Sequence, residues 1–375
     1  MIRLKHKEGQ KPYLSLKGID RFFGITKALQ KVDLDIYEGE VIGLVGPNGA
    51  GKSTMMKILT GVLPKTAGQI IYNGVPEENY NAKIAKQIGV SCAYQDLSLC
   101  TNLSIFENFA MLNVSHSIAP SKNWRNKTKT EVEKLLEKYF PGSNIDVTKP
   151  IETLSLTDRQ VVEICKTLMA DHLKILILDE PTSALSSDKA EQLHKIVAEL
   201  SEKGVAVIYI SHKLDEIKKI CDRATIMRNG RSMGTYDVKD ISTQEMSRLM
   251  VGREVSLKFD KKEQHLTDDV FMRVRNLTVH NAQGVLKVDN LSFDLKGGEI
   301  LGIAGVEGNG QSELIDPLTG LNKNYSGEVK IKGEDITKDS IEDIRELKLA
   351  HIPEDRMTSG CAGNLSIMEN IFSNQ

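Results

Sequence analysis

Apolar runs of strand length alternate with helix-like periodicities between residues 13 and 252. The runs are short, rich in β-branched residues and closed by polar or glycine-rich turns, which is typical of buried strands in a parallel sheet. Helical spacing of apolar residues follows the first buried run and recurs at 104–111, 127–139 and 161–169. The pattern therefore predicts an α/β fold. Strands are expected at Val41–Val45, Ile88–Ala93, Ile175–Leu178 and Val205–Ile210, with an alternating, half-buried strand before them at Val32–Ile36.

The turn after the first buried run carries a complete phosphate-binding motif, Gly46-Pro47-Asn48-Gly49-Ala50-Gly51-Lys52-Ser53-Thr54, set between a strand and a helix. The glycines let backbone N–H groups point at phosphates, and the helix N-terminus adds partial positive charge. Lys52 is expected to reach the β and γ phosphates of a nucleoside triphosphate and Ser53 to hold Mg²⁺, with Thr54 supporting the turn. A glycine-rich turn that merely opens a helix is the alternative. The predicted nucleotide contacts are Gly46, Asn48, Gly49, Ala50, Gly51, Lys52, Ser53 and Thr54.

Two carboxylates end the third apolar run, where open α/β sheets bind ligands. We expect Asp179 to support the magnesium shell and Glu180 to act as general base on the attacking water. An acidic pair that only caps the next helix is the alternative, and the complete phosphate loop disfavours it.

Single polar residues follow two further runs. Gln95 follows Ile88–Ala93 and is a candidate Mg²⁺ ligand and γ-phosphate sensor, although a lone glutamine is usually just solvated. His212 follows Val205–Ile210 and is a candidate γ-phosphate sensor, although a lone histidine is usually structural. Both predictions depend on the company of the other motifs.

Length and charge narrow the class of protein. The 375 residues are too many for one ordinary domain and enough for two with sound cores. A net charge of −2 gives no field that would attract nucleic acid. No apolar run is long enough to cross a bilayer, and the five scattered cysteines fit reduced thiols. These features favour a cytoplasmic protein.

The order of the motifs, with Leu154-Ser155 lying between Gln95 and Asp179, resembles the ATP-binding subunit of an ABC transporter. The resemblance implies a P-loop NTPase fold, with a RecA-like core, an antiparallel β subdomain and a helical subdomain at about 97–170. It also implies two such units that hold ATP between the phosphate loop of one and the LSGGQ signature of the other. Phe23, from an aromatic pair expected in a turn, suits the family's base-stacking position; burial of the pair in the core is the alternative.

The signature segment departs from the family pattern. Leu154 and Ser155 remain, whereas Leu156, Thr157 and Asp158 replace two glycines and a glutamine. Side chains and a negative charge then stand where bare backbone should approach a phosphate. The signature of this half is expected to be poor.

The second part of the chain repeats the first at an offset of 259 residues, which aligns the glycines of the phosphate loop with those of 305–310. At this offset Lys52 falls on Gln311 and Gln95 on Glu354, so the second loop loses its cation and gains a like charge facing phosphate. We expect the second site to bind ATP weakly or not to turn it over.

Such asymmetry resembles the tandem importers of simple sugars and nucleosides. The resemblance implies a first ABC domain at 1–252, a linker at 253–269 and, at 270–375, the N-terminal part of a degenerate second domain, hence a truncated tandem repeat. It implies import of a ribose- or galactose-like sugar, with a nucleoside as the alternative. The implied partners are transmembrane permease subunits, an extracytoplasmic sugar- or nucleoside-binding protein and a second ABC domain in cis or in trans, at the cytoplasmic face of the membrane.

Two other classes are weighed against this one. A soluble ABC protein acting on ribosomes or DNA is expected to carry two intact sites with a long charged arm, zinc-binding cysteines or a long coiled coil, and the sequence has none of these. A module that binds ATP without cleaving it is the other, and turnover that needs an added C-terminal half would favour it.

Overall fold

The computed structural model describes residues 10–95, 97–111, 123–170, 172–252, 267–281, 284–305, 309–337, 339–353 and 360–373. The chain divides into two compact units, Met1–Leu257 and Lys258–Gln375. Most of the linker predicted at 253–269 lies outside the described residues. Within the described segments, every helix is too short or too polar to span a bilayer.

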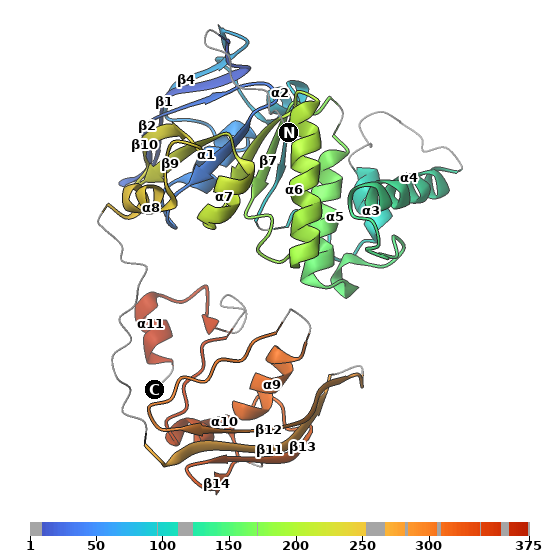
Figure 1. Cartoon of the computed structure of the whole chain (residues 1–375), viewed down its shortest axis with the longest axis vertical. Coiled ribbons are helices and arrows are strands. Elements are labelled where there is room, and N and C mark those ends of the chain that lie inside the picture. Colours follow the sequence, from blue (N-terminus) through green and yellow to red (C-terminus); the bar gives the residue numbers. More distant parts are fainter. Residues whose placement is uncertain are drawn as a thin grey trace. The chain divides into compact units, whose positions relative to one another are not determined.

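A six-stranded sheet in the order β10-β9-β3-β8-β7-β6 forms the centre of the first unit (Figure 1). The strands β9, β3, β8, β7 and β6 are parallel, and β10 pairs antiparallel with β9. The sequence predicted β3, β6, β7 and β8 because they are short apolar runs. The bounds are β3 Val41–Val45, β6 Val90–Ala93, β7 Ile175–Asp179, β8 Ala206–Ile210, β9 Arg223–Arg228 and β10 Arg231–Asp237.

A second, antiparallel sheet in the order β2-β1-β4-β5 lies in the same unit. Its strands are β1 Leu14–Phe23, β2 Thr26–Ile36, β4 Ala67–Tyr72 and β5 Val75–Pro76. Apolar residues of β1 and β2 form one buried cluster with β3 and α1 (Lys52–Leu59). The prediction that the Phe22-Phe23 pair lies in a turn was wrong, because both residues pair with β2 at the end of β1.

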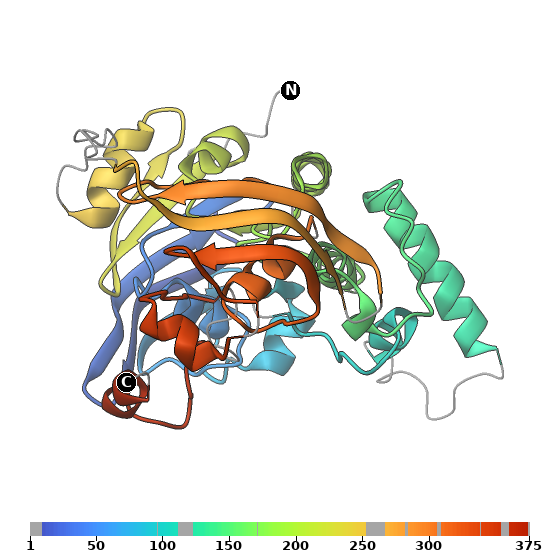
Figure 2. The same ribbon diagram turned by 90° about the horizontal axis from the view of Figure 1, so that it is seen from below.

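Helices complete the first unit. Their bounds are α2 Ala82–Gln87, α3 Ile105–Ala110, α4 Trp124–Tyr139, α5 Leu156–Leu168, α6 Ser187–Glu202, α7 Leu214–Ile220 and α8 Thr243–Val251. Figures 1 and 2 both show α3 and α4 to one side of the six-stranded sheet. The Trp124 ring packs on Phe106 of α3, with ring centroids 6.2 Å apart.

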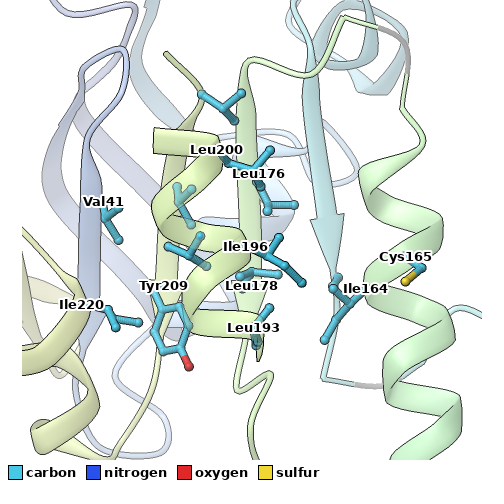
Figure 3. Close-up of a cluster of buried hydrophobic side chains, with 14 of the residues drawn as sticks. Val41, Ile164, Cys165, Leu176, Leu178, Leu193, Ile196, Leu200, Tyr209 and Ile220 are labelled. Atoms are coloured by element: carbon cyan, nitrogen blue, oxygen red, sulfur yellow. The ribbon is translucent and has the colours of Figure 1, made fainter. Parts of the chain in front are cut away.

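The main core of the first unit lies between the six-stranded sheet and the helices (Figure 3). Aliphatic side chains of β7 meet those of α6 there, and α5 contributes from the neighbouring position. Burial of both faces of β7 and β8 explains why their sequences are continuous apolar runs rather than alternating ones. This core fixes where the carboxyl ends of the parallel strands lie.

The second unit contains a four-stranded sheet in the order β12-β11-β13-β14, visible as long curved strands in Figure 2. Its elements are β11 Val270–His280, β12 Leu286–Lys296, β13 Tyr325–Ile331, β14 Glu334–Asp335, α9 Gln311–Leu318, α10 Ile341–Glu346 and α11 Ile367–Phe372. Residues 300–304 repeat β3 in sequence but form no strand, and Ile300 is 84% exposed. In the first unit β3 lies between β8 and β9, and the described residues of the second unit contain no counterparts of those two strands.

Candidate nucleotide-binding site

The phosphate loop joins β3 to α1 and is held by two neighbouring strands. Gly51 precedes α1 with a φ of 101°, and a Cβ there would lie 2.6 Å from the carbonyl oxygen of Ala28 on β2. A Cβ on Gly46 would lie 2.5 Å from the carbonyl oxygen of Met227 on β9. These positions need glycine because other strands approach the loop closely, in addition to any contact with phosphate. This packing holds the loop in place before the N-terminus of α1, where backbone N–H groups can bind an anion.

Lys52 folds back over this loop. Its Nζ donates hydrogen bonds to the carbonyl oxygens of Gly46 at 2.7 Å and Pro47 at 3.1 Å. The side chain is buried, and burial lowers the pKa of Lys52, whereas the carboxylates of Glu180 and Asp179 act in the opposite direction. The ammonium is thus placed among acceptors, at the mouth of a loop suited to phosphate oxygens.

The predicted acidic pair and the histidine meet at the ends of β7 and β8. Because β8 lies between β3 and β7, the three parallel strands bring their carboxyl ends to one edge of the sheet. Asp179 is buried as the last residue of β7. Glu180 follows it with a φ of 47°, a conformation unusual for a residue other than glycine, and its N–H donates to the carbonyl of Ile210 at 3.0 Å.

Glu180 and His212 are brought together by this arrangement. The Nδ1 atom of His212 lies 3.2 Å from Oε1 of Glu180, with the imidazole 60% exposed and the glutamate side chain 14% exposed. The backbone of Glu180 is in a strained region that surrounding structure must hold, and such outliers concentrate at functional sites. The structure therefore joins two residues that sequence reasoning singled out separately.

The other predicted residues of the phosphate loop, and Gln95, differ in their exposure. Asn48, Gly49, Ser53 and Gln95 are exposed, Thr54 is half-buried and Ala50 is buried. Gln95 lies on the loop after β6, which is the edge strand beside β7.

Phe23 is 47% exposed at the tip of the β1–β2 hairpin, the same hairpin whose Ala28 touches the phosphate loop. The guanidinium of Arg21 lies over its ring, 4.5 Å from the centroid. The Phe23 ring is therefore partly exposed on the hairpin and is not buried in the core, as the alternative would require.

Sequence reasoning missed the residues that hold the loop after Gln95. Ser98 donates to Oε1 of the buried Glu163 at 2.5 Å, and the Nζ of Lys166 donates to the Ser98 carbonyl at 2.7 Å. Both partners come from α5. A carboxylate within the apolar face of that helix was the available sequence signal, since buried charges need partners.

The signature segment is engaged within its own unit. The hydroxyl of Thr157 donates to the Ala184 carbonyl at 2.6 Å, and the Nζ of Lys189 donates to Oδ1 of Asp158 at 2.8 Å. The negative charge that the sequence placed at the signature is therefore paired with a lysine of α6. Leu156 remains largely exposed.

The repeated loop of the second unit is described only in part. Gly310 precedes α9 with a φ of 93°, matching Gly51, and Gln311 occupies the place of the lysine. A cavity of about 290 Å³ lies beside it, lined by residues that include Lys287, Gly305 and Gln311. Residues 306–308 and Glu354, the predicted counterpart of Gln95, lie outside the described residues.

A phosphate loop after one parallel strand and an acidic pair after its near neighbour define a P-loop nucleoside triphosphatase. The ABC transporter family matches residues 29–183 and 288–373, so the chain belongs to that family and is an ABC-type ATPase. Both the predicted fold class and the predicted tandem repeat are confirmed by these two matched segments.

The relatives share most of this chain. It is 37% identical over 366 residues to the D-allose import ATP-binding protein AlsA of Escherichia coli, covering 96% of this chain and 70% of the relative. It is 38% identical over 362 residues to the ribose import ATP-binding protein RbsA of Clostridium tetani, with the same coverage. It is 37% identical over 354 residues to the nucleoside import ATP-binding protein NupA of Lactococcus lactis, covering 94% and 69%.

Solved structures support the fold. A nucleotide-free ATP-binding cassette from an ABC transporter matches with a TM-score of 0.53 and 24% identity, covering 64% of this chain and 95% of that one. The ADP conformation of MJ1267, another such cassette, matches with a TM-score of 0.53 and 23% identity, covering 64% and 96%.

Proposed function

We propose that this chain energises the import of a simple sugar of the ribose, allose or xylose type by hydrolysing ATP at the Lys52 site. The observation that carries the proposal is the meeting of Lys52, Asp179, Glu180 and His212 at one edge of the parallel sheet. The sugar class is supported by relatives named for D-allose, ribose and xylose import.

The chain's own groups divide the work on ATP. The loop amides and Lys52 bind the phosphates, and Lys52 exchanges its bonds to Gly46 and Pro47 for phosphate oxygens. Glu180 takes the proton of the attacking water, while His212, 3.2 Å away, orients that carboxylate and contacts the γ-phosphate. Phe23 supplies a face for the adenine base.

Mg²⁺ fits the residues of this edge. Ser53 and Asp179 offer the hard oxygen donors that the ion prefers, and Gln95 adds an amide oxygen from the neighbouring loop. Among the described residues no group of three or more His, Cys, Asp and Glu could hold a metal ion. Mg²⁺ is usually held by one or two carboxylates together with the phosphates of the nucleotide. When bound, Mg²⁺ neutralises charge on the β and γ phosphates.

A nucleoside is the second candidate substrate, because the relative NupA is named for nucleoside import at 37% identity. In either case the proposed partners are transmembrane permease subunits, an extracytoplasmic binding protein and a second ABC domain in cis or in trans. We place the chain at the cytoplasmic face of the membrane, with a first ABC domain at 1–252, a linker at 253–269 and part of a degenerate second domain at 270–375.

Two measurements test the proposal. Purified chain should bind ATP and release phosphate, and Lys52→Ala should lower the rate about 100-fold or more while the far-ultraviolet circular dichroism is unchanged. Binding without phosphate release in the unmodified chain would favour the nucleotide-binding module instead.

Uptake in the native cell separates the substrates. Deletion of the gene should abolish uptake of labelled ribose, allose or xylose, and the unmodified gene but not the Lys52→Ala form should restore it. Loss of uridine uptake with sugar uptake intact would replace the sugar by a nucleoside.

A further inference from the structure

One carboxylate outside all the motifs receives hydrogen bonds from both loops of the proposed catalytic edge. Glu216 lies on α7, and its side chain is 15% exposed. The hydroxyl of Thr182 donates to it, 2.8 Å from Oε1 and 2.9 Å from Oε2. The phenol of Tyr209 and the hydroxyl of Ser211 reach Oε2 at 3.1 Å and 3.2 Å.

A cation completes the set. The Nζ of Lys213 lies 3.3 Å from Oε1 of Glu216 and 3.4 Å from the hydroxyl of Thr182. Two oxygens therefore receive three hydroxyl donors and one ammonium, which is close to the full capacity of a carboxylate. Donors to an ionised acceptor form the stronger class of hydrogen bonds, and Thr182 and Ser211 are themselves buried.

The donors come from segments that flank the proposed catalytic residues. Thr182 lies two residues after Glu180, and Ser211 and Lys213 lie on either side of His212. Tyr209 anchors the group from within β8, where Figure 3 shows its ring among aliphatic side chains of the core. Glu216 thus connects the loop after β7, the loop after β8 and helix α7.

We infer that Glu216 is a positioning residue, which fixes the loop of Glu180 against the loop of His212 and so sets the contact between these two side chains. The inference rests on the proposed function, since it assigns a consequence for ATP hydrolysis. Glu216 itself acts through Thr182, Ser211 and Lys213 and does not touch the nucleotide. Tyr209, Ser211 and Lys213 lie within seven residues of Glu216, whereas Thr182, 34 residues away, is brought to it only by the fold.

The test uses the full chain with Glu216→Gln, which keeps the shape of the side chain but removes its charge and turns one acceptor into a donor. Glu245→Gln is the matched control, because Glu245 is a glutamate on α8 whose side chain is 41% exposed and pairs with Arg248 three residues on. Thr182→Val removes one donor and serves as the second variant if Glu216→Gln does not fold. Steady-state ATP hydrolysis, thermal unfolding and the ¹³Cε1 resonance of His212 are measured for each.

We expect Glu216→Gln to lower kcat about 10- to 100-fold with KM for ATP changed less than about twofold, because misplaced groups cost rate more than binding. The His212 resonance, assigned with His212→Gln, should shift or broaden in Glu216→Gln and stay in place in Glu245→Gln. Thr182→Val should change both quantities in the same direction but less.

Two results would overturn the inference. One is a kcat for Glu216→Gln within about twofold of the unmodified chain. The other is a loss of kcat accompanied by a similar fold loss of ATP affinity and a lowered unfolding temperature, which would indicate general destabilisation. Should the unmodified chain release no phosphate, the proposed ATPase function fails by that result alone. The His212 resonance then decides the inference, since an unchanged resonance in Glu216→Gln refutes it and a shifted one supports it.

Discussion

Asn108 carries a hydrogen-bond network that occurs twice in this chain in two different environments. In the first unit its Oδ1 accepts from the Cys100 N–H at 2.8 Å, and its Nδ2 donates to the carbonyls of Cys100, Leu103 and Ser104. Asn370 makes the same four bonds with Ala362, Leu365 and Ser366. Asn108 is fully buried, whereas the bonds of Asn370 are exposed.

The expected cost of Asn108→Ala follows from which groups lose a partner. The three carbonyls keep second hydrogen bonds, from the N–H groups of Leu103, Ile151 and Asn108. The Cys100 N–H loses its bond to Oδ1. The bond that the Cys100 N–H loses is only partly buried, so this unpaired donor costs toward the lower end of about 1–3 kcal/mol. With about 1 kcal/mol more for the lost amide bonds, we expect Asn108→Ala to lower the free energy of unfolding by about 2–3 kcal/mol.

The assay is urea unfolding of the full chain, monitored by the fluorescence of Trp124. Trp124 is the single tryptophan of the chain and packs on Phe106 of α3, so its signal reports on the first unit. Asn370→Ala should leave this transition in place. Hydrogen exchange compares the two networks directly. The amides of residues 97–104 should lose far more protection in Asn108→Ala than the amides of residues 360–366 lose in Asn370→Ala. The reason is that water can replace exposed hydrogen bonds, so that their loss costs no more than about 0.5 kcal/mol.

Two outcomes would refute this reasoning. One is a loss below about 0.5 kcal/mol for Asn108→Ala, which would mean that the segment relaxes to satisfy the Cys100 N–H. The other is an equal loss of protection in both variants, which would mean that burial does not set the cost of these bonds.

Two further changes test the loop and a buried histidine. Gly51→Ala combines a φ of 101° with a Cβ 2.6 Å from the Ala28 carbonyl oxygen, and should lower the free energy of unfolding in urea by about 2–4 kcal/mol. Gly49→Ala, with a φ of 79° and no atom within 4 Å of the new Cβ, should lower it by about 1 kcal/mol. Equal losses would show that the close approach of Ala28 to Gly51 has no energetic effect. His194 has no hydrogen-bond partner for either ring nitrogen among the described residues, and burial lowers its pKa below the ordinary value of 6.5. Since the unfolded chain therefore takes up the proton at a higher pH than the folded chain, the free energy of unfolding should fall as pH drops below 6.5. His194→Leu should reduce that fall, whereas His280→Gln, at an exposed histidine, is the control. A pH profile that His194→Leu leaves unchanged would contradict the prediction.

Local pattern was enough to predict much of the candidate site. The phosphate loop is one continuous motif, and Asp179, Glu180 and His212 each follow an apolar strand, so a parallel sheet must bring them to one edge. The sequence also predicted the repeat, because glycines needed by the backbone recur at a fixed offset. It misplaced Phe22-Phe23, because two aromatic residues before a glycine suit a strand end as well as a turn.

Other features were decided only by tertiary packing. Glu216 gains Thr182 and Glu163 gains Ser98 from distant segments of the sequence. Asp158 is paired with Lys189 on another helix. Such pairings depend on which loops the fold brings together, and neither periodicity nor motif spacing records them.

The two copies of the β3 sequence show the same division between sequence and fold. Val41–Val45 is a fully buried strand between β8 and β9, whereas the equally apolar residues 300–304 form no strand among the described residues. The sequence by itself determined that both segments are apolar and lead into a glycine-rich turn. Only the tertiary structure decided that one becomes a strand, because a β-strand needs neighbours that accept and donate its backbone hydrogen bonds.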